Sequence, residues 1–148
     1  MNPTLSIVVG LPLHLPLWLP LRTQLWPEET EENHLQEMQE ILDSTETDVL
    51  LAMLDKQVVG FAEVSLRPWA SGCTTKPVGY LEGIFVVEKV RQTGVGAALL
   101  RKAENWTRQQ GCKEMASDVL LDNHVSHDFH KRCGFQEVER VVTYARKL

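Results

Sequence analysis

A six-residue stretch, R-Q-T-G-V-G from Arg91 to Gly96, carries the residue types of a phosphate-binding turn. Glycines let the main chain approach a phosphate closely, and the N-terminus of a following helix supplies N–H groups and the positive end of its dipole. Arg91 adds a charge-assisted donor. A dinucleotide-binding turn would need a third glycine where Leu99 stands, and a P-loop would need Gly-Lys-Ser/Thr. The turn therefore indicates a pyrophosphate ligand of another kind.

Two carboxylates stand within or at the end of apolar runs that we predict to be strands. Glu82 lies inside Y-L-E-G-I-F-V-V, and Asp118 ends E-M-A-S-D. A buried carboxylate is costly unless it is paired or receives a cation, so each is a candidate for binding a cation or accepting a proton. Two structural alternatives stay open: Glu82 paired with an arginine, and Asp118 as a cap or turn residue.

The elements that must position these residues follow a mixed α/β order. Gly83, beside Glu82, predicts a bulge in its strand, and Pro12, Pro16 and Pro20 predict a broken or kinked first helix. A hairpin over 55–57 is expected between the second and third strands. The expected strands are 5–9, 48–54, 58–66, 80–87, 114–119 and 136–144, and the expected helices are 13–25, 33–42, 94–109 and 123–133.

Length and composition limit the class of protein. The chain has 148 residues, 43% hydrophobic and 24% charged, which predicts a single domain over 1–148. The net charge of -5 and the lack of any Lys or Arg run disfavour nucleic acid. The apolar stretch 5–21 is interrupted by prolines and has no basic residue ahead of it, so no signal peptide or membrane span is expected. Three widely spaced cysteines, Cys73, Cys112 and Cys133, predict reduced thiols in a cytoplasmic protein.

A run of histidines on one predicted helix raises the question of a metal site. His124, His127, His130 and Cys133 recur every three residues. Steps of three fall about 60° short of a full helical turn, so these side chains cannot converge on one ion. We therefore predict no metal.

The R-x-x-G-x-G turn after an apolar strand resembles the acyl-coenzyme A loop of the GCN5-related N-acetyltransferases (GNAT). Asn123, followed by F-H-K-R-C-G-F from Phe129, is similar to that superfamily's penultimate helix. The resemblance implies a mixed, mostly antiparallel sheet flanked by helices, with acetyl-CoA as co-substrate. It also implies coenzyme contacts from the main chain of Ile84, Phe85 and Val86, from Arg91, Gln92, Thr93, Gly94, Val95, Gly96 and Ala97, and from Asn123 and His130.

Further strings narrow the resemblance. Q-L-W-P from Gln24, H-L-Q-E-M from His34, L-E-G-I-F-V, E-M-A-S-D and the final predicted strand are similar, in order and spacing, to the aminoglycoside 6'-N-acetyltransferases. This implies direct acetylation of the 6'-amino group and antibiotic resistance. The proline-rich stretch 11–21 departs from the family's smoother first helix. The alternatives are an N-acetyltransferase for another small amine, a polyamine or a protein N-terminus, and an acyl-CoA-binding module without turnover.

The roles of the site residues follow from this resemblance. An attacking amine must be neutral, whereas a free alkylamine has a pKa of about 10.4, so a base is needed. We expect Asp118 to be that base, Glu82 to position the ammonium and Tyr144 to act as proton donor. Trp26, Trp69 and Glu139 are expected to contact substrate beside both acids. Glu139 and Tyr144 would face opposite sides of a regular strand, and related enzymes are often dimers, so a homodimer is expected.

Overall fold

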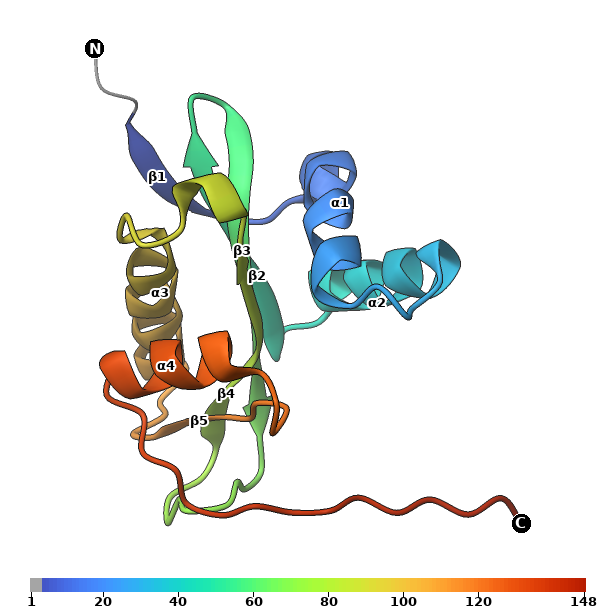
Figure 1. Cartoon of the computed structure of the whole chain (residues 1–148), viewed down its shortest axis with the longest axis vertical. Coiled ribbons are helices and arrows are strands. Elements are labelled where there is room, and N and C mark those ends of the chain that lie inside the picture. Colours follow the sequence, from blue (N-terminus) through green and yellow to red (C-terminus); the bar gives the residue numbers. More distant parts are fainter. Residues whose placement is uncertain (1–3) are drawn as a thin grey trace.

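The computed structural model describes residues 4–148, in which five strands form one sheet in the order of the chain. Neighbouring strands are antiparallel except for the last pair, which is parallel (Figure 1). The expected mixed, mostly antiparallel sheet is confirmed. The strands are β1 (Leu5–Val9), β2 (Thr47–Leu54), β3 (Gln57–Arg67), β4 (Val78–Val86) and β5 (Met115–Ser117).

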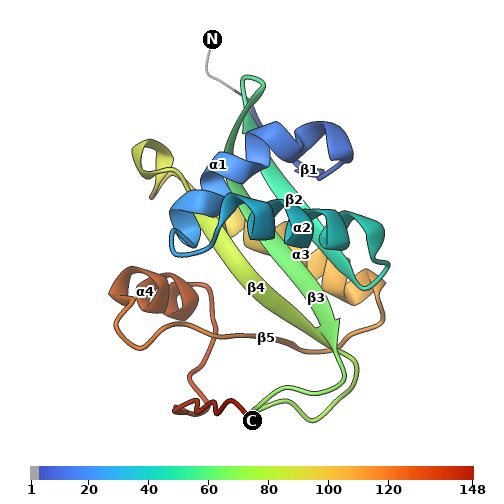
Figure 2. The ribbon, with the colours of Figure 1, turned by 90° about the vertical axis from the view of Figure 1, so that its right-hand side faces the viewer.

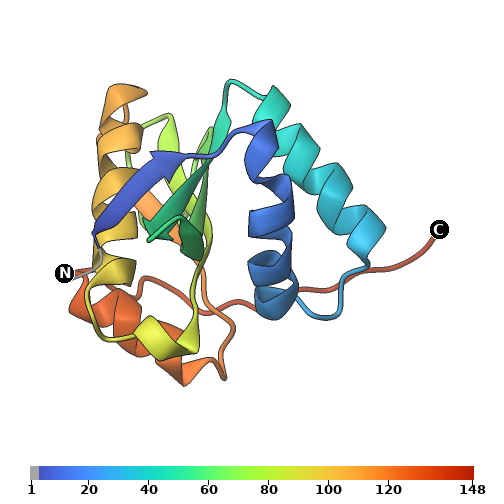
Figure 3. The same cartoon turned by 90° about the horizontal axis from the view of Figure 1, so that it is seen from above.

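Helices cover both faces of the sheet. Figures 1 and 3 show α1 (Leu15–Leu25) and α2 (Glu31–Asp43) on one face, and α3 (Val95–Gln109) and α4 (His124–Arg132) on the other. Short 3-10 turns, η1 (Pro12–His14) and η2 (Glu88–Val90), precede α1 and α3. Pro16 lies in the first turn of α1, where its missing N–H costs nothing, and the helix continues through Pro20.

Two apolar clusters fill the space between these layers. On the α3 side, Leu50, Leu99 and Ala103 are fully buried. On the α1–α2 side, Trp18, Met38 and Phe61 are fully buried. The central strands supply both clusters because successive side chains of a strand point to opposite faces.

An irregularity in β4 changes that alternation at Glu82. Glu63 of β3 pairs with Gly83 and Val64 pairs with Leu81, so Glu82 is an extra residue in the ladder. The predicted bulge is therefore confirmed. A side chain on Gly83 would come within 2.6 Å of the Trp26 ring, and Glu82 lines a groove on the same α1–α2 face. Two consecutive positions thus serve one face, as a bulge allows.

Most of the expected elements are confirmed, with two differences. The strand expected over 114–119 is limited to three residues. The prediction of a strand over 136–144 is wrong. Within the described residues this segment pairs with no strand and extends away from the body of the protein as an exposed tail (Figure 1). Its sequence has strand character, but it does not add to either outer strand of the sheet, β1 or β5. Over residues 4–148, no helix combines the length and hydrophobicity that a membrane crossing requires.

Candidate active site at the open edge of β4

The sheet opens between β4 and β5. Their last paired residues are Leu81 and Ser117, and β4 continues to Val86 with β3 as its neighbour. Figure 2 shows α4 lying beside this opening. Val87 donates its N–H to Val59 of β3, at 2.9 Å, and antiparallel geometry alternates the direction of main-chain groups. The main-chain groups of Ile84 and Val86 therefore face the opening, whereas those of Phe85 face β3.

The turn after β4 presents main-chain N–H groups at the same opening. Gln92 and Gly94 have positive φ values of 62° and 92°, and Gly94 caps α3. The first helical hydrogen bond runs from Ala98 to the Gly94 carbonyl, at 3.0 Å. Helix geometry consequently leaves the N–H groups of Val95, Gly96 and Ala97 free for an anion. This cradle fits the diphosphate of the expected coenzyme.

The Arg91 side chain connects the turn to the end of β4. Its Nε donates to the Val86 carbonyl at 2.7 Å, and its guanidinium lies 5.4 Å from the centre of the Phe85 ring. Thr93 also closes the turn, through a hydroxyl that donates to the Val90 carbonyl. The sequence predicted Arg91 as a phosphate ligand. The structure adds that this residue fixes the turn against β4.

Gly96 and Asn123 place α4 beside the turn. A Cβ on Gly96 would lie 2.9 Å from the Phe129 ring, so glycine permits the close approach of α4. Asn123 caps α4 as expected, accepting from the Ser126 N–H at 3.2 Å. The glycine of the turn thus has a packing role in addition to its expected role beside a phosphate.

His130 is buried where α4 packs on β5. Burial lowers the pKa of His130, which is therefore neutral at pH 7. Its Nδ1 donates to the Ser126 carbonyl at 2.8 Å, so its Nε2 accepts from the Ser117 hydroxyl at 2.9 Å. The rings of Phe129 and Phe135 contact it. Both ring nitrogens have protein partners, so the structure gives His130 a packing role at the position for which a coenzyme contact was predicted.

An acidic groove of about 610 Å³ lies on the opposite face, between the two N-terminal helices and the central strands. Trp26 forms part of its wall, and Arg22 and His34 also line it. Its carboxylates outnumber its cationic side chains, so the groove suits a ligand with several positive charges. The lining glutamates are Glu28, Glu29, Glu37, Glu40, Glu63 and Glu82.

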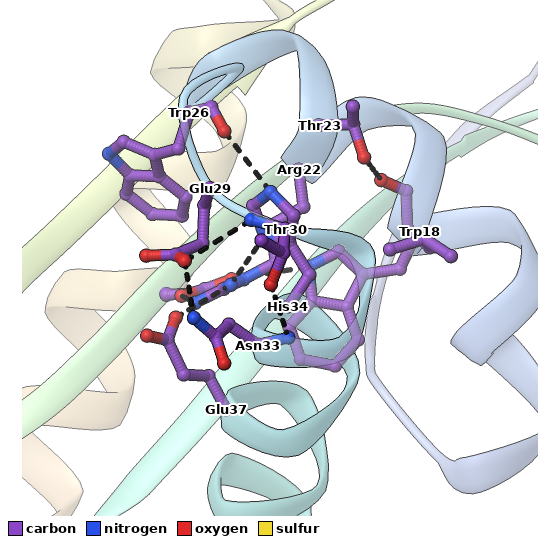
Figure 4. Close-up of polar contacts among 11 residues, drawn as sticks. Trp18, Arg22, Thr23, Trp26, Glu29, Thr30, Asn33, His34 and Glu37 are labelled. Atoms are coloured by element: carbon purple, nitrogen blue, oxygen red, sulfur yellow. Dashed lines mark hydrogen bonds and ion pairs between the residues drawn. The ribbon is translucent and has the colours of Figure 1, made fainter.

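A buried ionic network fixes Trp26 in this groove (Figure 4). Arg22 donates to both oxygens of Glu63, at 2.8 and 3.1 Å, and to Glu37 at 2.8 Å. Burial alone would lower the pKa of Arg22, but the bonds to these carboxylates raise it, so the guanidinium stays charged. Arg22 also lies 4.8 Å from the Trp26 ring centre. His34 accepts from Arg22 at 2.8 Å and donates to the Trp26 carbonyl at 3.1 Å.

Glu82 and Asp118 are linked by two residues that the sequence analysis missed. Arg67 donates to both oxygens of Glu82, at 2.5 and 2.8 Å, and its guanidinium lies 3.4 Å from the Tyr80 ring centre. Tyr80 donates its hydroxyl to Asp118 at 2.5 Å. Glu82 is therefore paired with an arginine, as one alternative held. The pairing of β3 with β4 could have suggested that Tyr80 lies beside this ion pair. Tyr80 is two residues before Glu82 in β4, and its partner in β3 is Ser65.

The remaining predicted substrate contacts lie near the loop between β3 and β4 or on the tail. Trp69 is in that loop and 71% exposed. Ser71 lies two residues after Trp69 in this loop, and its hydroxyl donates to Glu139. This bond brings the first part of the tail to the loop. Tyr144 is 93% exposed, and the structure does not gather it with Glu82 and Asp118. Among residues 4–148, no three His, Cys, Asp or Glu side chains are grouped to hold a metal ion.

Comparison with known proteins identifies the class. The model of the acetyltransferase (GNAT) family matches residues 15–135. The aminoglycoside N(6')-acetyltransferase type 1 of Acinetobacter haemolyticus is 45% identical over 132 residues, which is 88% of this chain and 90% of that protein. The structure of aminoglycoside N-acetyltransferase AAC(6')-Iy with CoA superposes with a TM-score of 0.96 at 38% identity, covering 100% of this chain and 98% of that one.

A second structure of AAC(6')-Iy holds a bisubstrate analogue, CoA-S-monomethyl-acetylneamine. It gives a TM-score of 0.94 at 38% identity and covers 98% of this chain and 99% of that one. These matches span nearly the whole chain. The chain therefore belongs to the GNAT acetyltransferases and, within them, to the aminoglycoside 6'-N-acetyltransferase family. Both resemblances drawn from the sequence are confirmed.

The turn can be tested with two glycines that share a backbone conformation. Gly94 has φ of 92° and Gly111, at the far end of α3, has φ of 85°; a Cβ on either would meet no atom within 4 Å. Alanine at a left-handed position costs about 1–2 kcal/mol, so both variants lose similar stability. Gly94→Ala raises the Kd for acetyl-CoA at least about tenfold because it strains the anion-binding turn, whereas Gly111→Ala leaves the Kd unchanged. Isothermal titration calorimetry measures both values. Equal affinities for the two variants would contradict a coenzyme site at this turn.

Proposed function

We propose that this protein transfers the acetyl group of acetyl-CoA to the 6'-amino group of aminoglycoside antibiotics and thereby confers resistance. The observation that carries the proposal is the pairing of an anion-binding turn at the open edge of β4 with an acidic groove on the opposite face of the same strand. The family membership supports it, since a relative binds CoA joined to an acetylneamine.

The residues at the open edge of β4 and in the turn after it bind the coenzyme. The free N–H groups of 94–97 bind the coenzyme diphosphate, with Arg91, Gln92 and Thr93 forming the turn. The main chain of Ile84 and Val86 extends along the opening, where an N–H donates to the thioester carbonyl. Phe85 contributes through its ring, which packs under Arg91. Asn123 caps α4, which lies beside the opening, and Asn123 and His130 remain the proposed coenzyme contacts from this helix.

Asp118 is the base in this proposal, and Glu82 orients the ammonium. The substrate amine gives one proton to Asp118, directly or through a water, because only the neutral nitrogen can attack. The nitrogen then bonds to the acetyl carbon as the carbon–sulfur bond breaks, with no covalent enzyme intermediate. A thiol has a pKa of about 8.5, so the thiolate is a tolerable leaving group. Tyr144 gives its proton to the thiolate and regains a proton from the second one that the amine nitrogen releases. Trp26, Trp69 and Glu139 contact the sugar rings.

We also propose that the protein is a homodimer in which the C-terminal tail associates with a second copy. Beyond Gly134 the tail is extended and exposes Val138, Val141 and Val142 by 61%, 71% and 76%. Within residues 4–148 this strand-like apolar segment pairs with no strand, and such a segment suits the edge of a neighbouring sheet. Glu139 then stays at the loop of its own copy through Ser71, whereas Tyr144, further along the tail, is free to serve the other site.

Two further expectations complete the proposal. Residues 1–148 act as one catalytic domain, since helices on both faces share a single sheet. The location is the cytoplasm, because Cys73, Cys112 and Cys133 are free thiols, as a reducing compartment favours.

The direct test of the activity is mass spectrometry of tobramycin after incubation with acetyl-CoA and the protein. The proposal predicts one added acetyl group, which fragmentation assigns to the ring bearing the 6'-amine. An acetyl group at another amine would favour a different regioselectivity. An unmodified drug, with no release of thiol, would favour a coenzyme-binding module.

The acidic groove predicts a selective effect of Glu82. Glu82→Gln removes one charge that attracts a multiply cationic substrate, so KM for tobramycin rises about tenfold, while KM for a simple monoamine changes less than about twofold. Glu104→Gln, which removes a carboxylate from α3 on the other side of the sheet, changes neither value. Steady-state kinetics of thiol release measure both substrates. An equal rise for the two amines would contradict a polycation site.

The dimer proposal predicts that mass depends on the tail. Sedimentation velocity of the unmodified protein gives twice the chain mass of 16.8 kDa. Val142→Asp places a charge in the apolar tail and shifts the protein to a monomer, whereas Leu35→Asp on the exposed side of α2 does not. A monomeric unmodified protein, or a dimer that survives Val142→Asp, would exclude this interface.

A further inference from the structure

Two side chains, Arg67 and Tyr80, join the two acids of the site, Glu82 and Asp118, in a continuous series of contacts. Arg67, the last residue of β3, ion-pairs with Glu82 and lies flat over Tyr80, and Tyr80 donates to Asp118. Ser65 adds a hydroxyl bond to Glu82 at 3.1 Å. Each contact joins different strands or strand ends, so the series of contacts crosses the sheet where β4 and β5 begin to separate.

The contacts of the two carboxylates differ in a way that bears on catalysis. Glu82 has both oxygens bound by Arg67, and one of them also by Ser65. Asp118 accepts one bond, on Oδ2, and no group within residues 4–148 donates to its Oδ1. Glu82 is thus held in place by Arg67 and contributes its charge to the groove, whereas Asp118 keeps one oxygen for an incoming amine.

Tyr80 is suited to hold Asp118 in this state. Its side chain is buried, with the residue only 8% exposed, and the Arg67 guanidinium lies over its ring. Burial and the bond to Asp118 both raise the pKa of Tyr80, so the phenol keeps its proton at neutral pH and always donates. A bond to a charged acceptor is among the stronger hydrogen bonds in a protein, and it fixes the carboxylate rotamer.

We propose that Tyr80 is a positioning residue for acetyl transfer, which orients the free oxygen of Asp118 toward the substrate amine. Arg67 fixes the positions of Tyr80 and Glu82 relative to each other. This inference rests on the proposed function, in which Asp118 is the base. Neither residue need touch the substrate. Tyr80 acts through the orientation of Asp118, and Arg67 acts through its two-point bond to Glu82 and its stacking on the ring.

A double-mutant cycle between Tyr80 and Asp118 tests the inference. Tyr80→Phe keeps the ring under Arg67 and removes only the hydroxyl, so kcat with tobramycin falls about tenfold while KM changes less than about twofold. In an Asp118→Asn background the same substitution changes kcat less than about twofold, because there is no longer a base to orient. Thr107→Val removes another buried hydroxyl, beside Gly79, and leaves kcat unchanged.

The outcomes separate this inference from the function on which it rests. A Tyr80→Phe variant with unchanged kcat, or with the same tenfold loss in both backgrounds, would overturn the positioning role and leave the acetyltransferase activity intact. An Asp118→Asn variant as active as the unmodified protein would overturn the assignment of the base and the inference together. Thermal unfolding of each variant is measured in parallel, and a Tm for Tyr80→Phe close to that of Thr107→Val assigns the loss of kcat to orientation.

Discussion

The extra residue in β4 is the constraint on which the site depends. Glu82 of β4 has no partner residue in β3, and the pairing with β5 ends immediately before it, at Leu81. Past this point one edge of β4 is open for the coenzyme, while two consecutive residues serve the groove face. Glu82 supplies a carboxylate there, and Gly83 supplies the space that the Trp26 ring fills. One irregularity thus places the two ligand sites on either side of a single strand.

The groove face is held by charge as well as by apolar packing. Arg22 and Glu63 are both almost fully buried, and Trp18 adds a bond to Glu63 at 3.2 Å. Removing one partner of such a pair costs about 3–5 kcal/mol because the other charge is left unpaired. The network fixes α1 and α2 against β3 and holds Trp26 by its ring and its carbonyl. A polar surface that must attract a polycation is therefore built on a rigid support.

The sequence predicted the parts of the site that are local in the chain. The glycine turn before α3, the cap at Asn123 and the bulge beside Gly83 each have a signal within a few residues. Arg67 and Tyr80 were missed because their roles depend on which strands are neighbours. From the sequence, Arg67 is the first residue after an expected strand and Tyr80 is the first residue of another. The Arg22 network was missed for the same reason, because it joins residues up to 45 positions apart.

His130 and the tail show how far a local pattern reaches. The coenzyme contact predicted for His130 stays a prediction, whereas the strand predicted for the tail is wrong. His130 lies in a string that resembles the family's coenzyme-binding helix, but two serines and two phenylalanines enclose it. The tail is rich in valine, as strands are, and that composition describes the segment correctly as extended. A strand also needs the unpaired edge of another strand, however. The sequence pattern does not show whether that other strand belongs to the same molecule or to a second copy.

The central claim is that acetyl-CoA occupies the opening of β4 and the turn before α3. Hydrogen exchange of the main-chain amides, followed with and without acetyl-CoA, tests it most directly. The account predicts slower exchange at Ile84, Val86 and residues 94–97 when the coenzyme is bound, with little change in α2. Unchanged exchange at these amides, or slowing confined to the α1–α2 groove, would contradict it.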